Sequence, residues 1–541
     1  MPGRNGRCEN GGNVDASARV EESQDERTRA TNESSPEDGS TTANAITHGS
    51  EVENGDEGEI GREQTDLEDS RDSQSGARDR AGVRDLPQFA ELASPTFRWG
   101  DVDGETFAHS VECCYEETVH WRRNLFKIPS GKAGKSFVHE LTKLFRAYAD
   151  GSALESIALK AAMVLPALML QKPHQKSKAK DHSSHLDRRL RMWARGDINA
   201  LMLECRTIQN QLGTRSNSRG SASEARTFAK LMMEGKVRAA LRTITATDNG
   251  GVLSLTKEVR ETLEKKHPPK QPPTPSAIIE PDTPFKEPHF ILFEKIDGHM
   301  IRETALKTDG AAGPSGLDAA AWKRLCSSFS SFSADLCDAM ASVAKRICTS
   351  YVDPSGLTAF TACRLIALDK CPGIRPIGIG ETARRIISRA ILTILKDEIQ
   401  AAAGPLQLCA GQEAGCEAAI HAMQEVFETP EVEAAIIVDA SNAFNSLNRQ
   451  NALRNIQHLC PSLATVLINT YREDVQLHID GETLLSQEGT TQGDPLAMAM
   501  YAIGILPLIH RLKGESVKQV WYADMPQLVP NSPTYEIGGT A

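Results

Sequence analysis

Apolar residues recur at helical spacing through the stretch that follows Val119. One set falls three or four positions apart, the spacing that places side chains on one face of an α-helix: Phe137, Leu141, Leu144, Phe145 and Tyr148. Residues 153–170 continue apolar and Ala-rich. We expect Pro166 to end or kink the helix there, because proline cannot donate the interior hydrogen bond. The pattern predicts a mainly helical region over residues 86–265.

Shorter apolar runs mark the second half of the chain. AAIIV, which ends at Val438, and VWY, which ends at Tyr522, are short and continuous, and such runs are most simply buried strands. Longer runs predict helices over 381–400, 411–427 and 496–512. Residues 305–524 are therefore predicted to contain both strands and helices.

Three segments lack the pattern of a packed core. Residues 1–85 are rich in Glu, Asp, Ser, Gly, Asn and Thr, and too few apolar groups remain to offset the entropy of ordering, so we expect disorder. Residues 266–304 contain eight prolines between positions 267 and 290, which predicts an extended linker that separates the two halves. Residues 525–541 are rich in Pro, Gly and Ser, and we expect them to form an irregular tail.

Charge is distributed unevenly. The formal charge of the chain is −11, and residues 1–85 account for all of it with 21 acidic and 10 basic residues. Residues 121–270 hold 29 basic and 13 acidic residues, including the stretch 171–196, which carries Trp193. A basic segment can attract a polyanion, but it can equally be a solvated helix surface.

Several kinds of site receive no support. The twelve cysteines are scattered without paired metal-ligand spacing. The longest apolar runs are too short to span a membrane, and no secretory signal opens the chain, so we expect an intracellular protein, nuclear or cytoplasmic.

PSGKAGKS (129–136) ends like a phosphate-binding loop, but Pro129 stands where that motif needs its first glycine.

Candidate chemistry lies in an ordered series of strings. Asp439 follows the AAIIV run directly, where it could present a carboxylate at a cleft or simply begin a helix as its N-cap. Before it comes CRLIALDKCPGIRPIGIG (363–380), and after it EGTTQGDPL (488–496) and VWYAD (520–524). Their joint order, rather than any one string, indicates a nucleotide polymerase.

Together these strings resemble the reverse transcriptases of non-LTR (LINE-like) retrotransposons. The resemblance covers residues 305–524, about two fifths of the chain, and begins at GAAGPSGLDAAAWKRL (310–325). It implies an α+β fold, a remnant of polymerase palm and fingers in which a small antiparallel sheet carries Asp439 and Asp524 against packed helices. It also implies an RNA-directed DNA polymerase with an RNA template, a DNA primer and dNTPs as partners.

The same resemblance assigns roles to individual residues. Asp439 and Asp524 would be the catalytic ligands of two Mg²⁺ ions that align the primer hydroxyl with the α-phosphate. Lys370 and Arg375 match the basic residues that hold the incoming triphosphate.

The remaining nucleotide contacts come from two further strings. Phe444 occupies the position that excludes a 2′-hydroxyl, which implies a deoxynucleotide substrate. Gln492 and Gly493 match the turn beneath the templating pair. Each of these side chains could instead be ordinary core or surface.

The chain departs from the family at the last string. Family members carry a second Asp where this chain has Met525, and the 17 residues after Asp524 predict neither the returning strand of the hairpin nor a thumb. An unpaired strand and a missing carboxylate both predict little or no polymerase activity. No endonuclease pattern and no CCHC knuckle appears in the sequence.

Two other hypotheses stay open. The chain could be a non-catalytic nucleic-acid-binding protein that uses residues 121–270. It could also be the product of a degraded element copy that does not fold stably.

Overall fold

Helices dominate the structure, and small sheets lie among them. The computed structural model describes residues 97–530 except 175, 214–220, 234, 236, 238–250, 280–287, 371, 431, 433–434 and 514–516. The predictions for residues 1–85 and 531–541 lie outside the described residues. The combination of helices with separate small sheets is that of an α+β protein. Among the helices described, none is long and apolar enough to cross a lipid bilayer.

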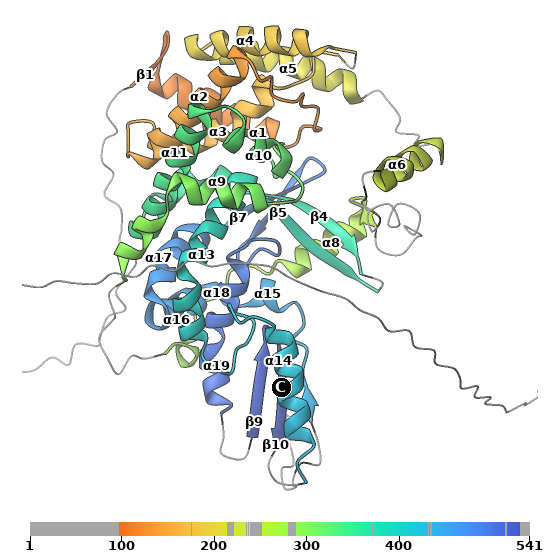
Figure 1. Cartoon of the computed structure of the whole chain (residues 1–541), viewed down its shortest axis with the longest axis vertical. Coiled ribbons are helices and arrows are strands. Elements are labelled where there is room, and N and C mark those ends of the chain that lie inside the picture. The colour runs from red at the N-terminus through yellow and green to blue at the C-terminus, as the bar shows by residue number, and fades with distance from the viewer. Residues whose placement is uncertain are drawn as a thin grey trace, which may run out of the picture. The chain divides into compact units, whose positions relative to one another are not determined.

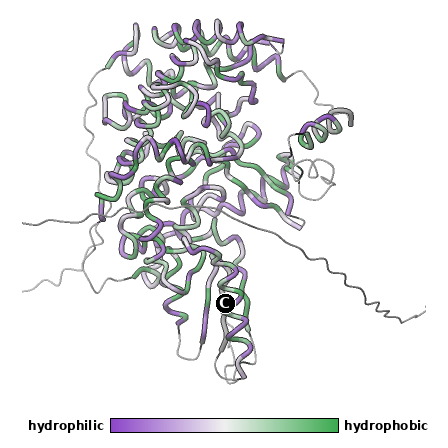
Figure 2. Tube along the Cα trace, viewed as in Figure 1, coloured by the Kyte–Doolittle hydropathy of each residue, from purple (hydrophilic) through white to green (hydrophobic). Residues whose placement is uncertain are grey.

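Most of the described residues between 97 and 265 lie in helices. These helices are α1 (Gly104–Thr118), α2 (Lys132–Ala149), α3 (Glu155–Met169), α4 (Ala179–Arg195), α5 (Ile198–Gly213), α6 (Ser221–Met233) and α8 (Lys257–Lys266), with β1 (Arg98–Trp99), β2 (Val102–Asp103) and β3 (Val252–Leu253) beside them. All five apolar residues of the predicted stripe on α2 are buried. Polar and apolar residues alternate along many helices in Figure 2, as expected where each buries one face.

Helix α3 contradicts one of the two alternatives predicted at Pro166, that the helix ends there. It does not end at Pro166 but continues to Met169, and the N–H group of Leu170 bonds to the Pro166 carbonyl at 3.0 Å. Every residue from Ile157 to Met169 is buried. A helix that is apolar on all sides is stabilised by packing around it, which offsets the hydrogen bond that proline cannot make.

The two halves of the chain share one apolar core. Helix α11 (Ser331–Thr349) packs against α2 from the first half and against α9 (Gly298–Lys307) and α17 (Pro461–Tyr471) from the second (Figure 1). The expected separation by a linker over 266–304 is therefore wrong. Local proline content could not show that α9 lies partly within this range and joins the core.

A five-stranded mixed sheet lies in the second half. Its strands are β3, β4 (Cys363–Asp369), β5 (Ile374–Gly380), β7 (Val475–Ile479) and β8 (Glu482–Ser486). Strand β5 pairs with β4 along its whole length, whereas β3 and β7 share the other edge of β4. Only the β4–β7 pairing is parallel. The β4–β5 hairpin carries Lys370 and Arg375.

A separate three-stranded antiparallel sheet has the order β6–β10–β9. It consists of β6 (Ile436–Ile437), β9 (Val517–Tyr522) and β10 (Met525–Pro530), and α14 (Gly415–Phe427) packs against it (Figure 1). The prediction of an irregular chain from 525 onward is wrong for residues 525–530, which return along β9 from Met525 opposite Tyr522 to Pro530 opposite Val517. The three predicted helices of this half also form, as α13 (Thr382–Ala403), α14, and α18 (Ala497–Gly504) with α19 (Leu506–Arg511).

The proline-rich stretch before α9 is bound along α16 (Arg449–Leu459) by asparagine side chains. Asn448, Asn451 and Asn455 donate amide hydrogens to backbone carbonyls of Gln271, Pro272, Thr274 and Ala277, at 3.0–3.4 Å. Asn455 also accepts from the Ile279 N–H group at 3.0 Å. We call residues 267–279 the strap. Prolines have no N–H group, so this stretch has few backbone donors of its own with which to pair its carbonyl groups. The asparagine side chains donate to these carbonyls instead.

The remaining elements are short: η1 (Pro275–Ala277), η2 (Phe290–Lys295), α10 (Ala319–Ser327), η3 (Pro354–Leu357), α12 (Thr358–Thr361) and α15 (Ala443–Ser446).

Candidate active site

Two carboxylates meet at one end of the three-stranded sheet. Asp439 lies two residues after β6, and Asp524 lies in the turn between β9 and β10. The antiparallel register pairs Ile437 with Gln527, which brings residue 439 beside that turn. The N–H group of Ala440 donates to the Asp524 carbonyl at 3.4 Å. Burial raises the pKa of the Asp524 carboxyl, and the negative charge of Asp439 raises it further.

The turn that carries Asp524 is held by a buried glutamine. Ala523 has φ +56°, a left-handed conformation that is costly for a residue with a side chain. The Gln407 side chain accepts from the Ala523 N–H at 2.9 Å and donates to the Ala523 carbonyl at 3.3 Å. The chain around Gln407 also bonds to Trp521 through two backbone hydrogen bonds, so it covers the outer edge of β9.

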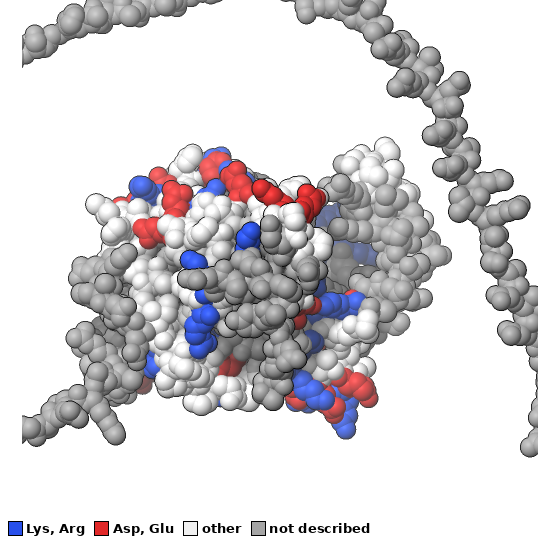
Figure 3. All heavy atoms as spheres, turned by 90° about the horizontal axis from the view of Figure 1, so that it is seen from below, with Lys and Arg blue, Asp and Glu red and all other residues white. Residues whose placement is uncertain are grey.

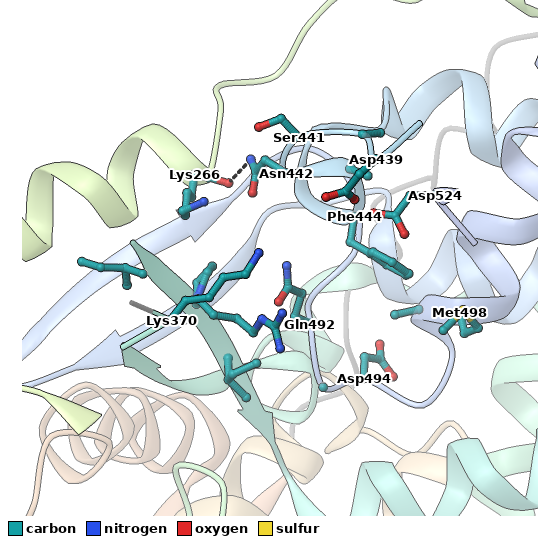
Figure 4. Close-up of a pocket in the computed structure, with 18 residues that line it drawn as sticks. Lys266, Lys370, Asp439, Ser441, Asn442, Phe444, Gln492, Asp494, Met498 and Asp524 are labelled. Carbon is teal, nitrogen blue, oxygen red and sulfur yellow. Dashed lines mark hydrogen bonds between the residues drawn. The ribbon is translucent and has the colours of Figure 1, made fainter. Parts of the chain in front are cut away.

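A cavity of about 750 Å³ opens in front of the carboxylate pair (Figure 4). Every site residue predicted from the sequence lines it: Asp439, Asp524, Lys370, Arg375, Phe444, Gln492 and Gly493. These residues come from the β4–β5 hairpin, the segment after β6, the loop before α18 and the β9–β10 turn. The tertiary structure thus brings all of them to one place.

The two predicted cations lie on the β4–β5 hairpin. Lys370 follows β4 directly, and its N–H group bonds to the Gly373 carbonyl at 2.9 Å, which closes the turn. Arg375 pairs with Leu368 in the antiparallel ladder. Both side chains are exposed, and within the described part of the chain neither forms an ion pair with a carboxylate. Their charge therefore remains available to an anion in the cavity.

The loop that carries Gln492 and Gly493 presses against strand β5. The Gln492 carbonyl accepts from the Gly378 N–H at 2.8 Å. Gly493 has φ +109°, and a Cβ atom there would lie 2.5 Å from the Gly378 carbonyl oxygen. Only glycine permits both the conformation and this approach.

Phe444 lies between the carboxylate segment and the apolar helix α18. Its ring stacks on Tyr501 with centroids 4.5 Å apart and planes inclined by 25°. Its carbonyl accepts from the Thr490 N–H at 2.6 Å, which ties it to the Gln492 loop. The stacking fixes one face of the ring, and Phe444 also lines the cavity.

Two buried charged residues, Arg449 and Glu488, support the start of the same loop through hydrogen bonds. Glu488 and Arg449 are 3% and 4% exposed, and the Arg449 N–H donates to Glu488 at 2.6 Å. The Arg449 guanidinium donates to the carbonyls of Gly489 and Glu488 and to Ser486 Oγ, each at 3.0 Å. Burial lowers the pKa of Arg449 to about 10. The second Glu488 oxygen accepts from the Gln271 N–H of the strap at 2.6 Å.

Asp494 also lines the cavity, but its carboxylate is already satisfied. Arg384 and Tyr471 both donate to one of its oxygens, and the Leu496 N–H donates to the other at 3.1 Å. The side chains of Asp494 and Arg384 are 1% and 3% exposed. Asp494 therefore holds the loop in place and contributes little free charge to the cavity.

Sequence reasoning missed several residues that build the site. Asp494 stands inside a string that was recognised, so its position next to Gly493 was a usable signal. Asn442 lies between Asp439 and Phe444, so its position was also a usable signal. Gln407 and Lys266 had no such signal, because their contacts are with distant parts of the chain. The Asn442 side chain donates to the Lys266 carbonyl at 2.9 Å. The backbone of Asn442 has φ +55°.

The carboxylate pair fits a divalent cation by its chemistry. Asp439 and Asp524 form no ion pair with any residue in the described ranges, and the pKa of Asp524 is raised by burial and then by its neighbour's charge. Paired carboxylates that repel one another are relieved by a hard cation with oxygen preference, such as Mg²⁺. The described residues contain no cluster of three or more His, Cys, Asp or Glu side chains suited to a metal.

Many basic side chains of the segment 121–270 already have acidic partners, so fewer are available to a polyanion than the composition implied. Many of its arginines pair with nearby acids: Arg123 with Asp318, Arg146 with Asp335, Arg188 and Arg189 with Glu204, Arg191 with Asp187, Arg195 with Asp197 and Arg206 with Glu117. Trp193 is fully buried against Trp99 and Phe107, so it cannot stack on a base.

The fold and the site together define an α+β protein with a carboxylate pair in a cavity lined by cations. No family model matches the chain, and no curated protein matches it.

Proposed function

We propose that this cavity is a nucleotidyl-transfer site of the reverse transcriptase type, from a non-LTR retrotransposon. One observation carries the proposal: residues assigned separately by four strings of sequence all line the same cavity. In this proposal the β6–β10–β9 sheet is the palm and the β4–β5 hairpin belongs to the fingers. The partners are an RNA template, a DNA primer and dNTPs, inside the cell in the nucleus or cytoplasm.

The side chains divide the work by position. Asp439 and Asp524 would hold Mg²⁺, which supplies charge neutralisation at the α-phosphate and orients the primer hydroxyl. Lys370 and Arg375, exposed and without acidic partners in the described ranges, bind the triphosphate. Phe444, fixed against Tyr501, packs against the sugar, where bulk disfavours a 2′-hydroxyl.

Met525 limits the expected activity. It pairs with Tyr522 at the start of β10, directly after Asp524, where the family carries a second carboxylate. One fewer anion at the site weakens the hold on divalent ions. We therefore propose an RNA-directed DNA polymerase site that binds nucleotide but extends a primer poorly.

Equilibrium binding of dTTP to the full chain, with and without Mg²⁺, tests the proposal without requiring turnover. We expect Mg²⁺-dependent binding that Asp439→Asn weakens by about tenfold, equivalent to about 1.4 kcal/mol. Asp480→Asn is the matched control, because Asp480 lies in the β7–β8 turn at φ +43°, a conformation that asparagine tolerates. Absence of binding, or equal affinity of wild type and Asp439→Asn, would refute the proposal.

The rival hypothesis of a nucleic-acid-binding module in residues 121–270 has less support. Many arginines of this segment are paired with acids, and Trp193 is buried. Figure 3 views the molecule from below, away from helices α2–α5 of this segment, and that face carries both acidic and basic side chains. The rival predicts that residues outside the cavity dominate binding of an oligonucleotide. A cooperative thermal transition of the purified chain would speak against the hypothesis of a product that does not fold.

A further inference from the structure

A third cation lines the cavity, and it comes from the basic segment 121–270 rather than from the strings that carry the resemblance. Lys266 is the last residue of α8 and is half-buried at the cavity wall. In Figure 4, Lys266 and Lys370 lie on one side of the cavity, and Asp439 and Asp524 on the other.

Helix α8 is attached to the same hairpin that carries the predicted cations. Strand β3, just before it, pairs with β4 through Val252 opposite Leu368 and Leu253 opposite Ala367. The helix itself packs against β5, with Val259 and Leu263 buried. A shift of the hairpin would therefore carry α8 with it.

The end of α8 is held from the opposite side as well. Asn442, three residues after Asp439, donates to the Lys266 carbonyl. Just beyond, the strap is anchored by Glu488 at Gln271 and by the asparagines of α16. The backbone at Lys266 is thus held by contacts both to the β4–β5 hairpin and to the segment that carries Asp439. These contacts fix the position of Lys266 at the cavity wall.

The charges at the cavity wall lack partners. Lys266, Lys370 and Arg375 form no ion pair with any carboxylate among the described residues, and Asp494 is already neutralised by Arg384. Three such cations, supplied by two elements around one compact cavity, suit a small and highly charged anion. An extended nucleic-acid backbone would instead favour a longer basic track than these residues form.

We infer that Lys266 is a third phosphate-binding residue of this site, and that it contacts the triphosphate of the incoming nucleotide. The inference rests on the proposed function and adds a residue to it. Lys266 fixes the tail of the nucleotide from the α8 side while Lys370 and Arg375 hold it from the hairpin. The region before residue 267 is then part of the nucleotide site rather than an appendage to it.

Equilibrium binding of Mg²⁺–dTTP and of inorganic triphosphate to the full chain tests this role. We expect Lys266→Ala and Lys266→Gln to weaken both by about tenfold, whereas Lys266→Arg stays within about threefold because the charge is kept. Lys265→Ala is the matched control: it removes the same charge one residue away, from an exposed side chain that does not line the cavity. Melting temperatures establish that the variants are folded, and Lys266→Gln keeps most of the aliphatic stem should Lys266→Ala fold poorly.

The outcomes separate the two ideas. If the wild type binds dTTP and Lys370→Ala weakens it, but Lys266→Ala and Lys266→Gln behave like Lys265→Ala, the inference is wrong and the proposed function stands. If Lys266→Ala weakens only binding of a primer–template oligonucleotide, Lys266 contacts nucleic acid and the inference is likewise wrong. If the wild type binds no triphosphate, both ideas fail together.

Discussion

The Cα atom of Gly493 lies against the carbonyl group of Gly378, so that a Cβ atom on Gly493 would stand 2.5 Å from that oxygen. The adjacent Gln492 carbonyl accepts from the Gly378 N–H at 2.8 Å. This contact joins the loop before α18 to strand β5, and therefore joins two walls of the cavity.

Gly493→Ala is expected to lower the free energy of unfolding by about 3 kcal/mol, because it adds a backbone clash to an unfavourable φ. Gly373→Ala is a matched control, since Gly373 has φ +105° with open space around it. It carries only the conformational cost, about 1 kcal/mol. Urea denaturation measures both, and equal losses would show that the Gly378 contact is unimportant.

Glu381 is expected to make stability depend on pH. It is buried and accepts from the Ser315 N–H and hydroxyl groups at 2.6 Å each, and burial raises its pKa from 4.5 to about 7. Because the folded-state pKa lies above the unfolded value, the stabilisation is present at low pH and is lost as the pH rises from 4.5 through 7.

Between pH 5 and pH 8 we therefore expect the wild type to lose about 2 kcal/mol of stability relative to Glu381→Gln, which cannot ionise. Denaturation of both proteins across this range is the measurement. Parallel pH profiles would contradict the assignment.

Asp494→Asn is expected to cost about 3 kcal/mol, because it leaves the Arg384 guanidinium buried without its counter-ion. Tyr471→Phe removes one hydrogen bond from the same carboxylate and should cost about 1 kcal/mol. A denaturant titration ranks the two. If Tyr471→Phe proves the more damaging, the ion pair does not dominate this cluster.

Asn455→Ala is expected to free the end of the strap. It removes both bonds to the strap, from Ile279 N–H and to the Ala277 carbonyl. Hydrogen exchange at the Ile279 amide should accelerate by at least about tenfold, while Gln450→Ala, on the same helix, leaves it unchanged. Unchanged exchange in Asn455→Ala would mean that other contacts hold the strap.

If the proposed function holds, Met525→Asp is expected to raise primer extension with Mg²⁺ and dNTPs by at least about tenfold, because it adds a carboxylate next in sequence to Asp524. Asp439→Asn in the same background should abolish the gain. Robust extension by the unaltered chain, lost on Asp439→Asn, would instead show that the second carboxylate is dispensable here.

Strand β10 shows where sequence reasoning fails. Pro526 and Pro530 argue against a strand in the middle of a sheet. However, β6 pairs only with Gln527 and Leu528 of β10. Pro526 and Pro530 lie outside this pairing, so neither removes a hydrogen bond between β10 and β6. How far a partner strand extends is a property of the fold, and no local pattern records it.

The strap shows the same limit from another side. Its prolines predicted an extended linker, whereas the strap contains the short helix η1 and is bound along α16. Side chains on α16, about 180 residues away, accept and donate its hydrogen bonds. A local pattern indicates which backbone groups lack partners, whereas the tertiary structure decides which distant side chains supply them.

The sequence by itself determined the helical stripe of α2 and a strand before Asp439, because periodicity and apolar runs are local. The prediction that this strand is buried is wrong, since β6 contains only Ile436 and Ile437, and Ile437 is exposed. Only the tertiary structure decided that Lys266 and Asn442 belong to the same cavity, that Asp494 is bound to Arg384 and Tyr471, and that the two halves share a core. Those relationships depend on contacts between residues far apart in the chain. Burial of apolar surface is non-directional, so an apolar residue in the sequence does not indicate which distant residue it will contact.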